Sequence, residues 1–178
     1  VLSNQVENFS PIERYIGAPL EWNGYFDEQT NYLIRFPNGW QVTDSGVGVP
    51  TSISGENARL RVETQEGTVD SLDDAEALVA DLRSTIAVQT SEDVTQYGLS
   101  GYRVAYTIET IDGSAQSGIV QILNDDGTAY IANLLLEDSG ATNLLELGED
   151  ADPRLTNAVA ALDSFSRLPE LEIASTDE

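Results

Sequence analysis

Residues 101–137 read GYRVAYTIETIDGSAQSGIVQILNDDGTAYIANLLLE, and this stretch decides the fold class. Apolar and polar residues alternate in residues 101–111, 117–123 and 129–137, which is typical of half-buried β-strands. An Asp-Gly pair in the turn at 124–127 predicts a β-hairpin between the last two segments. We therefore expect an antiparallel meander. Its first strand places four side chains on one face: Tyr102, Val104, Tyr106 and Ile108.

Three segments upstream extend this pattern. Residues 32–36 alternate, and Pro37-Asn38-Gly39 leads into residues 40–42, which predicts a strand, a tight turn and a second strand. The glycine-rich residues 45–55 are expected to form a loop. Residues 58–64 alternate again, which predicts a half-exposed strand. Leu60 and Val62 lie on one side of it, and Arg59, Arg61 and Glu63 on the other.

Two helices flank the meander. Ser71 with Asp74 three residues later resembles a capping box, and it opens an apolar stripe at helical spacing. The members of the stripe are Leu72, Ala75, Leu78, Val79, Leu82 and Ile86. Asp152-Pro153 opens the second helix, with Asp as N-cap and Pro at the first helical position. We expect it to bury Leu155, Ala158, Val159, Leu162 and Phe165 and to end before Pro169.

Hairpin-linked strands with two amphipathic helices predict the α+β class, an antiparallel β-sheet with helices packed on it. We expect one domain over residues 29–168, an extended arm over residues 1–28 and a tail over residues 169–178. The arm carries apolar side chains without helical or strand periodicity, and such side chains must be buried on the domain or on a partner. Six residues are therefore predicted to bind a partner: Phe9, Ile12, Tyr15, Ile16, Leu20 and Trp22.

The order and the sequences of these segments resemble those of the PsbP-like domains. This family includes the extrinsic photosystem II protein PsbP and many small exported bacterial lipoproteins. The resemblance implies an α/β/α sandwich, a location outside the cytoplasm and an accessory or binding role. It covers residues 31–168 and rests on the order of the elements, with one moderately specific motif, the FPxGW turn at 36–40. The segments that carry the pattern are YLIRFPNGWQV at 32–42, SLDDA at 71–75, GYRVAY at 101–106, NDDGTAYI at 124–131 and ALDSF at 161–165.

The chain also departs from that family. Photosynthetic members use basic residues for docking and His among their metal ligands, whereas this chain has no Lys and no His. We therefore carry over the fold and the location and assign no functional residue from the resemblance.

The residue types that are missing exclude several classes of enzyme. Without His, Cys or Lys, the chain cannot build a Ser-His-Asp or Cys-His site, a Walker A loop or a Schiff base. It has no GxGxxG motif for binding a dinucleotide. It also lacks His and Cys, the ligands that zinc and copper prefer. A hydrolase that works with two carboxylates is the enzyme class that survives. We predict no catalytic residue, no cofactor and no enzyme activity.

The charge excludes nucleic acid as a partner. Thirty-one acidic residues against eight arginines give a net charge of −23, which repels phosphate backbones. Arg59, Arg61 and Arg103 could share a sheet face and bind an anion or an acidic partner, although surface arginines more often pair with neighbouring carboxylates. No run of about 18 apolar residues is present, so we expect no membrane span.

Calcium is the metal that carboxylates could hold. Residues 124–127 and residues 70–74 each contain several side chains with oxygen ligands close together, but neither segment matches the twelve-residue EF-hand loop. A hairpin turn explains the first segment and a helix cap explains the second.

Two functions remain. The first is a non-catalytic accessory subunit that docks on a larger membrane or cell-surface protein complex outside the cytoplasm, through residues 1–28. The second is an exported domain that binds calcium or a small molecule. The chain contains no Met and begins at Val1, so we expect a processed form or a piece of a longer chain, with any leader or lipid anchor located before Val1.

Overall fold

The computed structural model describes residues 5–6, 22–140 and 143–168. In these residues the chain forms eleven strands and two helices. The strands are β1 (Gln5–Val6), β2 (Asn23–Asp27), β3 (Tyr32–Phe36), β4 (Gln41–Gly46), β5 (Val49–Gly55), β6 (Ala58–Glu66), β7 (Ile86–Gln96), β8 (Leu99–Glu109), β9 (Ala115–Asp125), β10 (Thr128–Leu136) and β11 (Ser166–Arg167). The helices are α2 (Leu72–Leu82) and α3 (Pro153–Asp163). Neither helix is long and apolar enough to cross a membrane.

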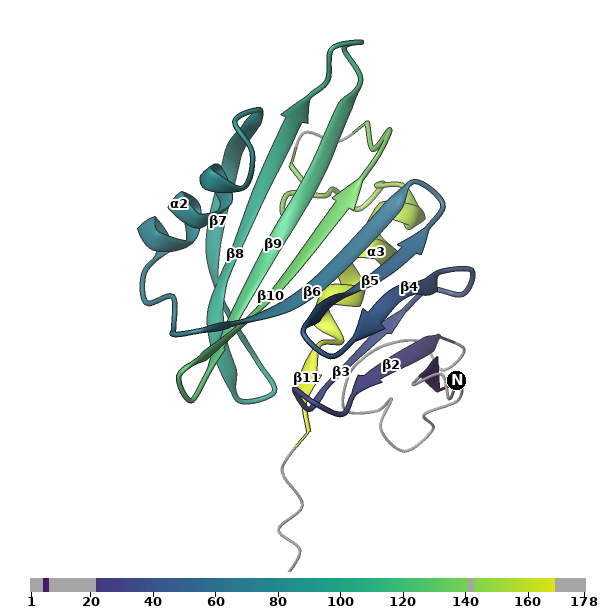
Figure 1. Ribbon diagram of the computed structural model, residues 1–178. Helices are drawn as coiled ribbons and strands as arrows, with labels where there is room; N and C mark the ends of the chain where they lie inside the picture. Colours follow the sequence, from purple (N-terminus) through teal and green to yellow (C-terminus); the bar gives the residue numbers. More distant parts are fainter. Residues whose placement is uncertain (1–4, 7–21, 141–142, 169–178) are drawn as a thin grey trace, which may run out of the picture.

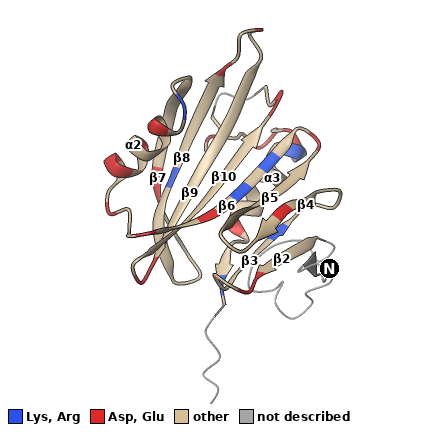
Figure 2. Ribbon diagram, in the orientation of Figure 1, with Lys and Arg blue, Asp and Glu red and all other residues tan. Residues whose placement is uncertain are grey.

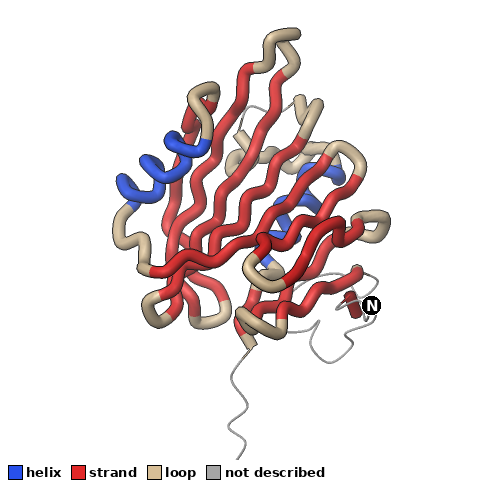
Figure 3. The backbone as a smooth tube through the Cα atoms, in the orientation of Figure 1, coloured by secondary structure: helices blue, strands red, loops and turns tan. Residues whose placement is uncertain are grey.

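The strands form two antiparallel sheets (Figures 1 and 3). The large sheet has seven strands in the order β4-β5-β6-β10-β9-β8-β7. The small sheet has the order β1-β2-β3-β11. The predicted antiparallel sheet with helices packed on it is confirmed, and the meander β8-β9-β10 is its centre.

Different elements pack on the two faces of the large sheet (Figure 1). On one face α2 packs against β7 and β8, where Ala75 and Val79 meet Val104, Tyr106 and the apolar residues around them. On the other face α3 and the small sheet enclose the larger apolar cluster. This gives the α/β/α layering that the resemblance implied.

The local signals for both helices are confirmed. The Ser71 hydroxyl accepts a hydrogen bond from the Asp74 backbone N–H, at 3.1 Å, and begins α2. The Asp152 carboxylate accepts one from the Arg154 N–H, at 2.9 Å, and begins α3 with Pro153 in its first turn. Each cap satisfies a backbone donor that has no partner inside its helix.

The hairpin predicted at Pro37-Asn38-Gly39 is wrong. The strands on its two sides belong to different sheets, because β3 pairs with β2 and β11 whereas β4 pairs with β5. Trp40 is the physical reason: its ring lies over Gly55 of β5, where a Cβ atom would come within 2.3 Å of the ring. The turn therefore carries the chain from the small sheet into the large one.

The loop predicted at residues 45–55 is also wrong, because most of this segment forms the β4-β5 hairpin. Thr51 and Ile53 are buried and alternate with the half-exposed Ser52 and Ser54. This is a strand pattern. Small polar residues on the outward side hid the alternation in the sequence.

The first helix is shorter than its apolar stripe, and β7 was not predicted. The helix α2 ends at Leu82, and Ile86 begins β7 at the edge of the large sheet. An edge strand buries little, and every residue of β7 is exposed or half-buried. Its polar residues therefore produced no clear apolar alternation.

Two aromatic residues of the predicted arm belong to the core. Trp22 and Tyr25 are 5% and 4% exposed, and residues 23–27 form β2 of the small sheet. Phe165, expected inside the last helix, follows its C-cap and stacks on Tyr32 with ring centroids 5.2 Å apart. The aromatic cluster around Tyr32 connects α3 and the small sheet to Tyr130 of β10.

A buried polar network fixes α3 to the large sheet. Arg103 on β8 is 7% exposed. Its guanidinium donates to Gln121 Oε1 at 2.7 Å, to Gln96 Oε1 at 3.2 Å and to Asp163 Oδ1 at 2.6 Å. Asp163 is the last residue of α3, so strands β7, β8 and β9 all contribute to one contact with the end of that helix.

The two glutamines complete the network. Gln96 Nε2 donates to the backbone carbonyls of Leu162 and Phe165, at 3.0 and 2.9 Å, and Gln121 Nε2 donates to Leu162 at 3.2 Å. Carbonyls at the end of a helix have no partner within the helix. Side-chain amides of the large sheet, oriented by Arg103, therefore cap the C-terminal end of α3.

Replacing Arg103 by Met should destabilise the protein by about 1–3 kcal/mol, because the buried amide oxygen of Gln121 and the half-buried amide oxygen of Gln96 lose their donor. Arg59→Met is the matched control, because Arg59 forms an exposed ion pair and should cost less than about 1 kcal/mol. Urea unfolding measures both changes. Equal losses in the two variants would contradict a role for the network in stability.

Candidate protein-binding face

Half of the α2 side of the large sheet has no described element packed on it. The helix α2 lies over β7 and β8, whereas β4, β5, β6 and the adjoining part of β10 stay open on this side (Figure 1). We call the outward side chains of this region the open face. Its members include Gln41, Asp44, Ser52, Ser54, Arg59, Arg61, Glu63 and Asn133, together with Gln116 at the neighbouring end of β9 and Glu137 just after β10.

The strand register places these side chains on one surface. Arg59 pairs with Leu135 and Arg61 with Asn133 across β6 and β10, and Leu135 packs on the cluster beneath α2. Paired residues of neighbouring strands point to the same side of a sheet. Ser52 in turn pairs with Arg61. The open face therefore lies beside α2, on the side of the sheet away from α3.

The two arginines of β6 are paired but remain accessible. Arg59 Nη2 lies 3.1 Å from Glu137 Oε1, and Arg61 Nη2 lies 3.5 Å from Glu63 Oε2. Their side chains are 70% and 59% exposed. Exposed pairs of this kind contribute at most about 1 kcal/mol, so either guanidinium can exchange its carboxylate for another acceptor at low cost. In Figure 2 the blue segments of β6 lie in the middle of the sheet.

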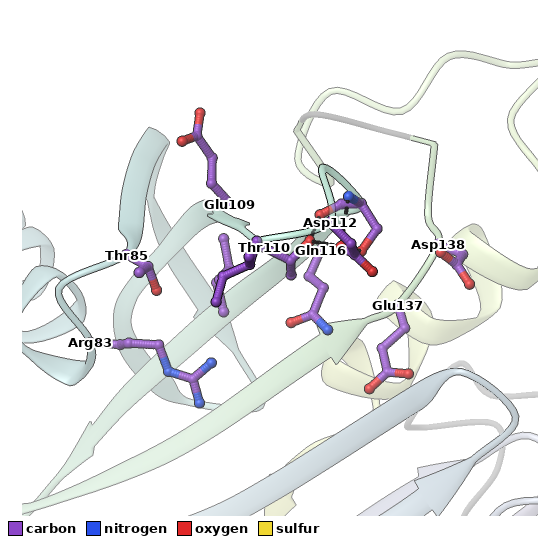
Figure 4. Close-up of a pocket in the computed structure, with 11 residues that line it drawn as sticks. Arg83, Thr85, Glu109, Thr110, Asp112, Gln116, Glu137 and Asp138 are labelled. Carbon is purple, nitrogen blue, oxygen red and sulfur yellow. Dashed lines mark hydrogen bonds between the residues drawn. The ribbon is translucent and has the colours of Figure 1, made fainter.

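Arg103 does not share this face, which corrects one sequence interpretation. It pairs across β8 and β9 with Gln121, on the α3 side of the sheet, and it is buried in the network described above. Arg83, at the C-cap of α2, extends over the sheet instead and lines the upper end of the open face (Figure 4).

Tyr106 forms the floor beside Arg83. Its ring occupies the space above Gly118 on the neighbouring strand, where a Cβ atom would lie 2.2 Å from the ring. Its hydroxyl donates to Asn133 Oδ1 at 2.6 Å. This bond turns the Asn133 Nδ2 group, for which the described residues hold no acceptor, away from Tyr106. Burial raises the pKa of Tyr106 to about 12, although the Asn133 hydrogen bond and the Arg83 charge both lower it.

A hollow of about 850 Å³ lies at the upper end of the open face. Arg83 enters it from one side and Glu137 and Asp138 from the other, with Gln116 between them (Figure 4). Asp112 lies on the β8-β9 turn at its rim. Hydrogen bonds from the Thr110 hydroxyl, and then from the Ser114 hydroxyl and backbone, lower the pKa of Asp112 to about 2. The hollow is wide and open to solvent, which suits a protein surface better than an enclosed ligand.

Of the six predicted partner-binding residues, Trp22 alone lies within the described part of the chain. Trp22 is buried in the core below α3, and its carbonyl accepts a hydrogen bond from the buried Arg35. Phe9, Ile12, Tyr15, Ile16 and Leu20 lie outside the described residues. The sequence analysis missed Arg83 and Asn133. Asn133 carried a signal, because it is the only polar residue in the apolar run at 129–136.

Two oxygen-bearing side chains in each of the segments considered for calcium are engaged in structural contacts. Asn124 exchanges two hydrogen bonds with the backbone of Val69, and Asp125 pairs with Arg167. Asp126 and Gly127 form the hairpin turn at positive φ. In the other segment, Ser71 and Asp74 form the cap of α2. No group of three or more potential metal-binding carboxylates occurs among the described residues.

Alkaline pH should test the environment of Tyr106. Tyr106 ionises near pH 10 in the unfolded chain but only near pH 12 in the folded protein, because the fold buries its neutral ring. The contribution of this neutral ring to the stability of the fold is therefore complete below pH 10 and is lost as the pH rises toward 12. We expect the free energy of unfolding to fall between pH 9 and pH 11 by about 1 kcal/mol more in the wild type than in Tyr106→Phe. Urea unfolding at both pH values measures this difference, and an identical fall in the two proteins would contradict it.

No protein-family model matches this sequence, and no curated protein sequence matches it significantly. Comparison of structures does find proteins with a similar fold. Cyanobacterial PsbP (CyanoP) from Synechocystis sp. PCC 6803 is similar with a TM-score of 0.55 and 16% identity, over 83% of this chain and 92% of that chain. A protein from Bacteroides thetaiotaomicron has a TM-score of 0.50 and 9% identity, over 83% of this chain and 48% of that chain.

The Ran-binding protein Mog1p from Saccharomyces cerevisiae is similar to a comparable degree, with a TM-score of 0.56 and 12% identity, over 83% of this chain and 95% of that chain. Identities this low establish the fold and nothing finer. The resemblance to PsbP-like domains is thus confirmed at the level of the fold: the chain has the PsbP-like α+β fold.

Proposed function

We propose that this chain is a non-catalytic binding module that docks on a protein partner through the open face. The observation that supports the proposal most directly is the exposure of half a sheet face whose side chains are arginines and hydrogen-bonding groups. Non-obligate protein interfaces have this polar character, and arginine is enriched in them.

The lack of catalytic residue types supports binding over catalysis. The whole sequence contains no His, Cys or Lys, so nucleophilic catalysis with these residues has no basis. The hollow beside Arg83 holds carboxylates, but in a wide depression open to solvent. A pair of carboxylates that acts on a substrate needs an enclosed site in which their protonation states differ.

The fold relatives support the same class of function. Mog1p is described as a Ran-binding protein, and CyanoP carries the same fold. We extend the proposal to an accessory subunit outside the cytoplasm that associates with a larger membrane or cell-surface complex. Residues 9–20, with their five apolar side chains, form a second contact with the partner in this proposal.

Site-specific photo-crosslinking tests the docking face. A benzoylphenylalanine at Ser52 should capture one dominant partner in cells of the source organism, because this position lies on the open face next to Arg61. The same probe at Ala80, on the exposed side of α2, is the control and should capture that partner at most weakly. A third probe at Tyr15 tests the N-terminal segment.

Capture from Tyr15 with none from Ser52 would overturn the open face as the docking site and leave the N-terminal segment as the interface. Equal capture from Ser52 and Ala80 would contradict a specific face altogether. Thermal unfolding of each probe-bearing protein shows that a missing crosslink does not come from misfolding.

A further inference from the structure

We infer that the free edge of β7 binds an extended segment of a partner protein that carries lysine or arginine, and that this segment joins the large sheet as a further strand. The inference goes beyond the proposed function and does not rest on it, because it concerns the edge of the sheet beside α2 and not the open face. It follows from the backbone groups of the edge, from the position of α2 and from the charges along the strand.

The end of β7 next to the β7-β8 turn directs backbone groups away from the sheet. Both turn residues, Tyr97 and Gly98, have positive φ, 48° and 79°, which is typical of a two-residue hairpin whose flanking residues pair through hydrogen bonds. Pairs with and without hydrogen bonds then alternate along the ladder. The residues whose N–H and C=O groups point away from β8 are therefore Ser91, Asp93 and Thr95. The described part of the chain provides no partner for these groups.

An extended backbone is the group that matches this edge. Unpaired N–H and C=O groups along a strand are a template for a further strand, and many extended peptides bind proteins in this way. The edge is accessible, since Asp93 and Thr95 are exposed and no residue of β7 is buried. A register shift between Val88 and Thr90, and the contact of Thr90 with Asn143, mark the other end of the free stretch. The stretch therefore accepts a segment of about six residues.

The helix α2 forms a wall beside this edge. It lies along β7 in Figure 1 and packs against β7 and β8. The Ser91 hydroxyl donates to Glu76 Oε1, which fixes this carboxylate of α2 above the strand. A segment that pairs with β7 beside Ser91 places every second side chain on the side of the sheet where Glu76 lies.

The charge of this region is of one sign. Together α2 and β7 contain no basic residue, and their acidic residues are Asp73, Asp74, Asp81, Glu76, Glu92 and Asp93. Arg83 follows α2 but lies near the start of β7, at the opposite end from the free stretch. Arg103 pairs with Glu92 across β7 and β8, but it is buried and contacts Asp163.

These carboxylates determine which segment fits. Opposite charges on neighbouring strands stabilise a sheet and like charges destabilise it. A segment with Lys or Arg at alternate positions can pair with Asp93 and Glu76 on one side of the sheet. Two copies of this chain would instead bring Glu92 and Asp93 of both edges together, against the repulsion of two chains that each carry a net charge of −23.

Hydrogen exchange of the full chain, followed by NMR, tests the edge. In the free protein the amides of Ser91, Asp93 and Thr95 should exchange fast, whereas the neighbouring amides of β7 that bond to β8 should be protected. The probe is an eight-residue peptide that alternates Val with Lys. At 0.3 M NaCl the screening length is only about 6 Å, which suppresses unspecific attraction. At ten times its dissociation constant the peptide should slow the exchange of the three amides about tenfold.

Two further peptides separate strand pairing from charge. The first is the Val-Lys peptide with an N-methyl group on every residue, which keeps the charge but cannot donate ladder hydrogen bonds. The second alternates Val with Glu. Neither should protect the three amides. Equal protection by the methylated peptide would overturn the strand pairing, and equal protection by the glutamate peptide would overturn the basic character of the partner.

Single variants of the protein test the contact with the lysine side chains. Asp93→Asn should weaken binding of the Val-Lys peptide about threefold, which is what a cross-strand pair of opposite charge contributes. Glu56→Gln, in the β5-β6 turn, changes the net charge equally and should leave the affinity unchanged. Equal losses in both variants would contradict a contact at Asp93.

The state of the free chain gives a last test. Protection of the Ser91, Asp93 and Thr95 amides without peptide, together with a doubled mass in light scattering, would show that a second copy occupies the edge and would overturn the inference. A monomer in which these amides exchange fast would support it.

Discussion

A seven-stranded sheet has two broad faces that need to be covered. In the described part of this chain, α2 is the one element that packs on the first of these faces. The helix covers β7 and β8 and leaves β4 to β6 and part of β10 open on that side. The outward residues of β5, β6 and β10 must therefore tolerate water, which is why Ser52, Ser54, Arg59, Arg61 and Asn133 stand opposite buried apolar neighbours. The shortage of cover creates the polar surface from which we derive the function.

The opposite face of the large sheet is covered in a different way. There α3 and the small sheet bury a continuous apolar cluster, and the position of α3 depends on polar side chains from three strands. Apolar contacts alone would hold the helix on the sheet without fixing its rotation or its end. Arg103, Gln96 and Gln121 add directional contacts with the last carbonyls of α3, and directional contacts favour a single arrangement of the helix.

The charge of the molecule connects the fold with the proposed function. A protein with a net charge of −23 stays soluble but repels most acidic surfaces. Arg35 and Arg103 are buried in the core, whereas Arg59 and Arg61 stay exposed on the open face, each beside a glutamate. In the function that we propose, such exposed arginines would be the first candidates for the few residues that dominate binding energy in protein interfaces.

Local signals in the sequence were enough for the helix caps at Ser71 and Asp152, the turn at Asp126-Gly127 and the meander around it, because each depends on neighbouring residues. They also determined which chemistries are impossible. The partition of β3 and β4 between two sheets, the edge strand β7 and the gathering of Arg83 and Asn133 on one face depended on contacts between distant segments. Alternation tells which side chains share a face of one strand, but only the packing of α2 against β7 and β8 decided which part of that face stayed open to water.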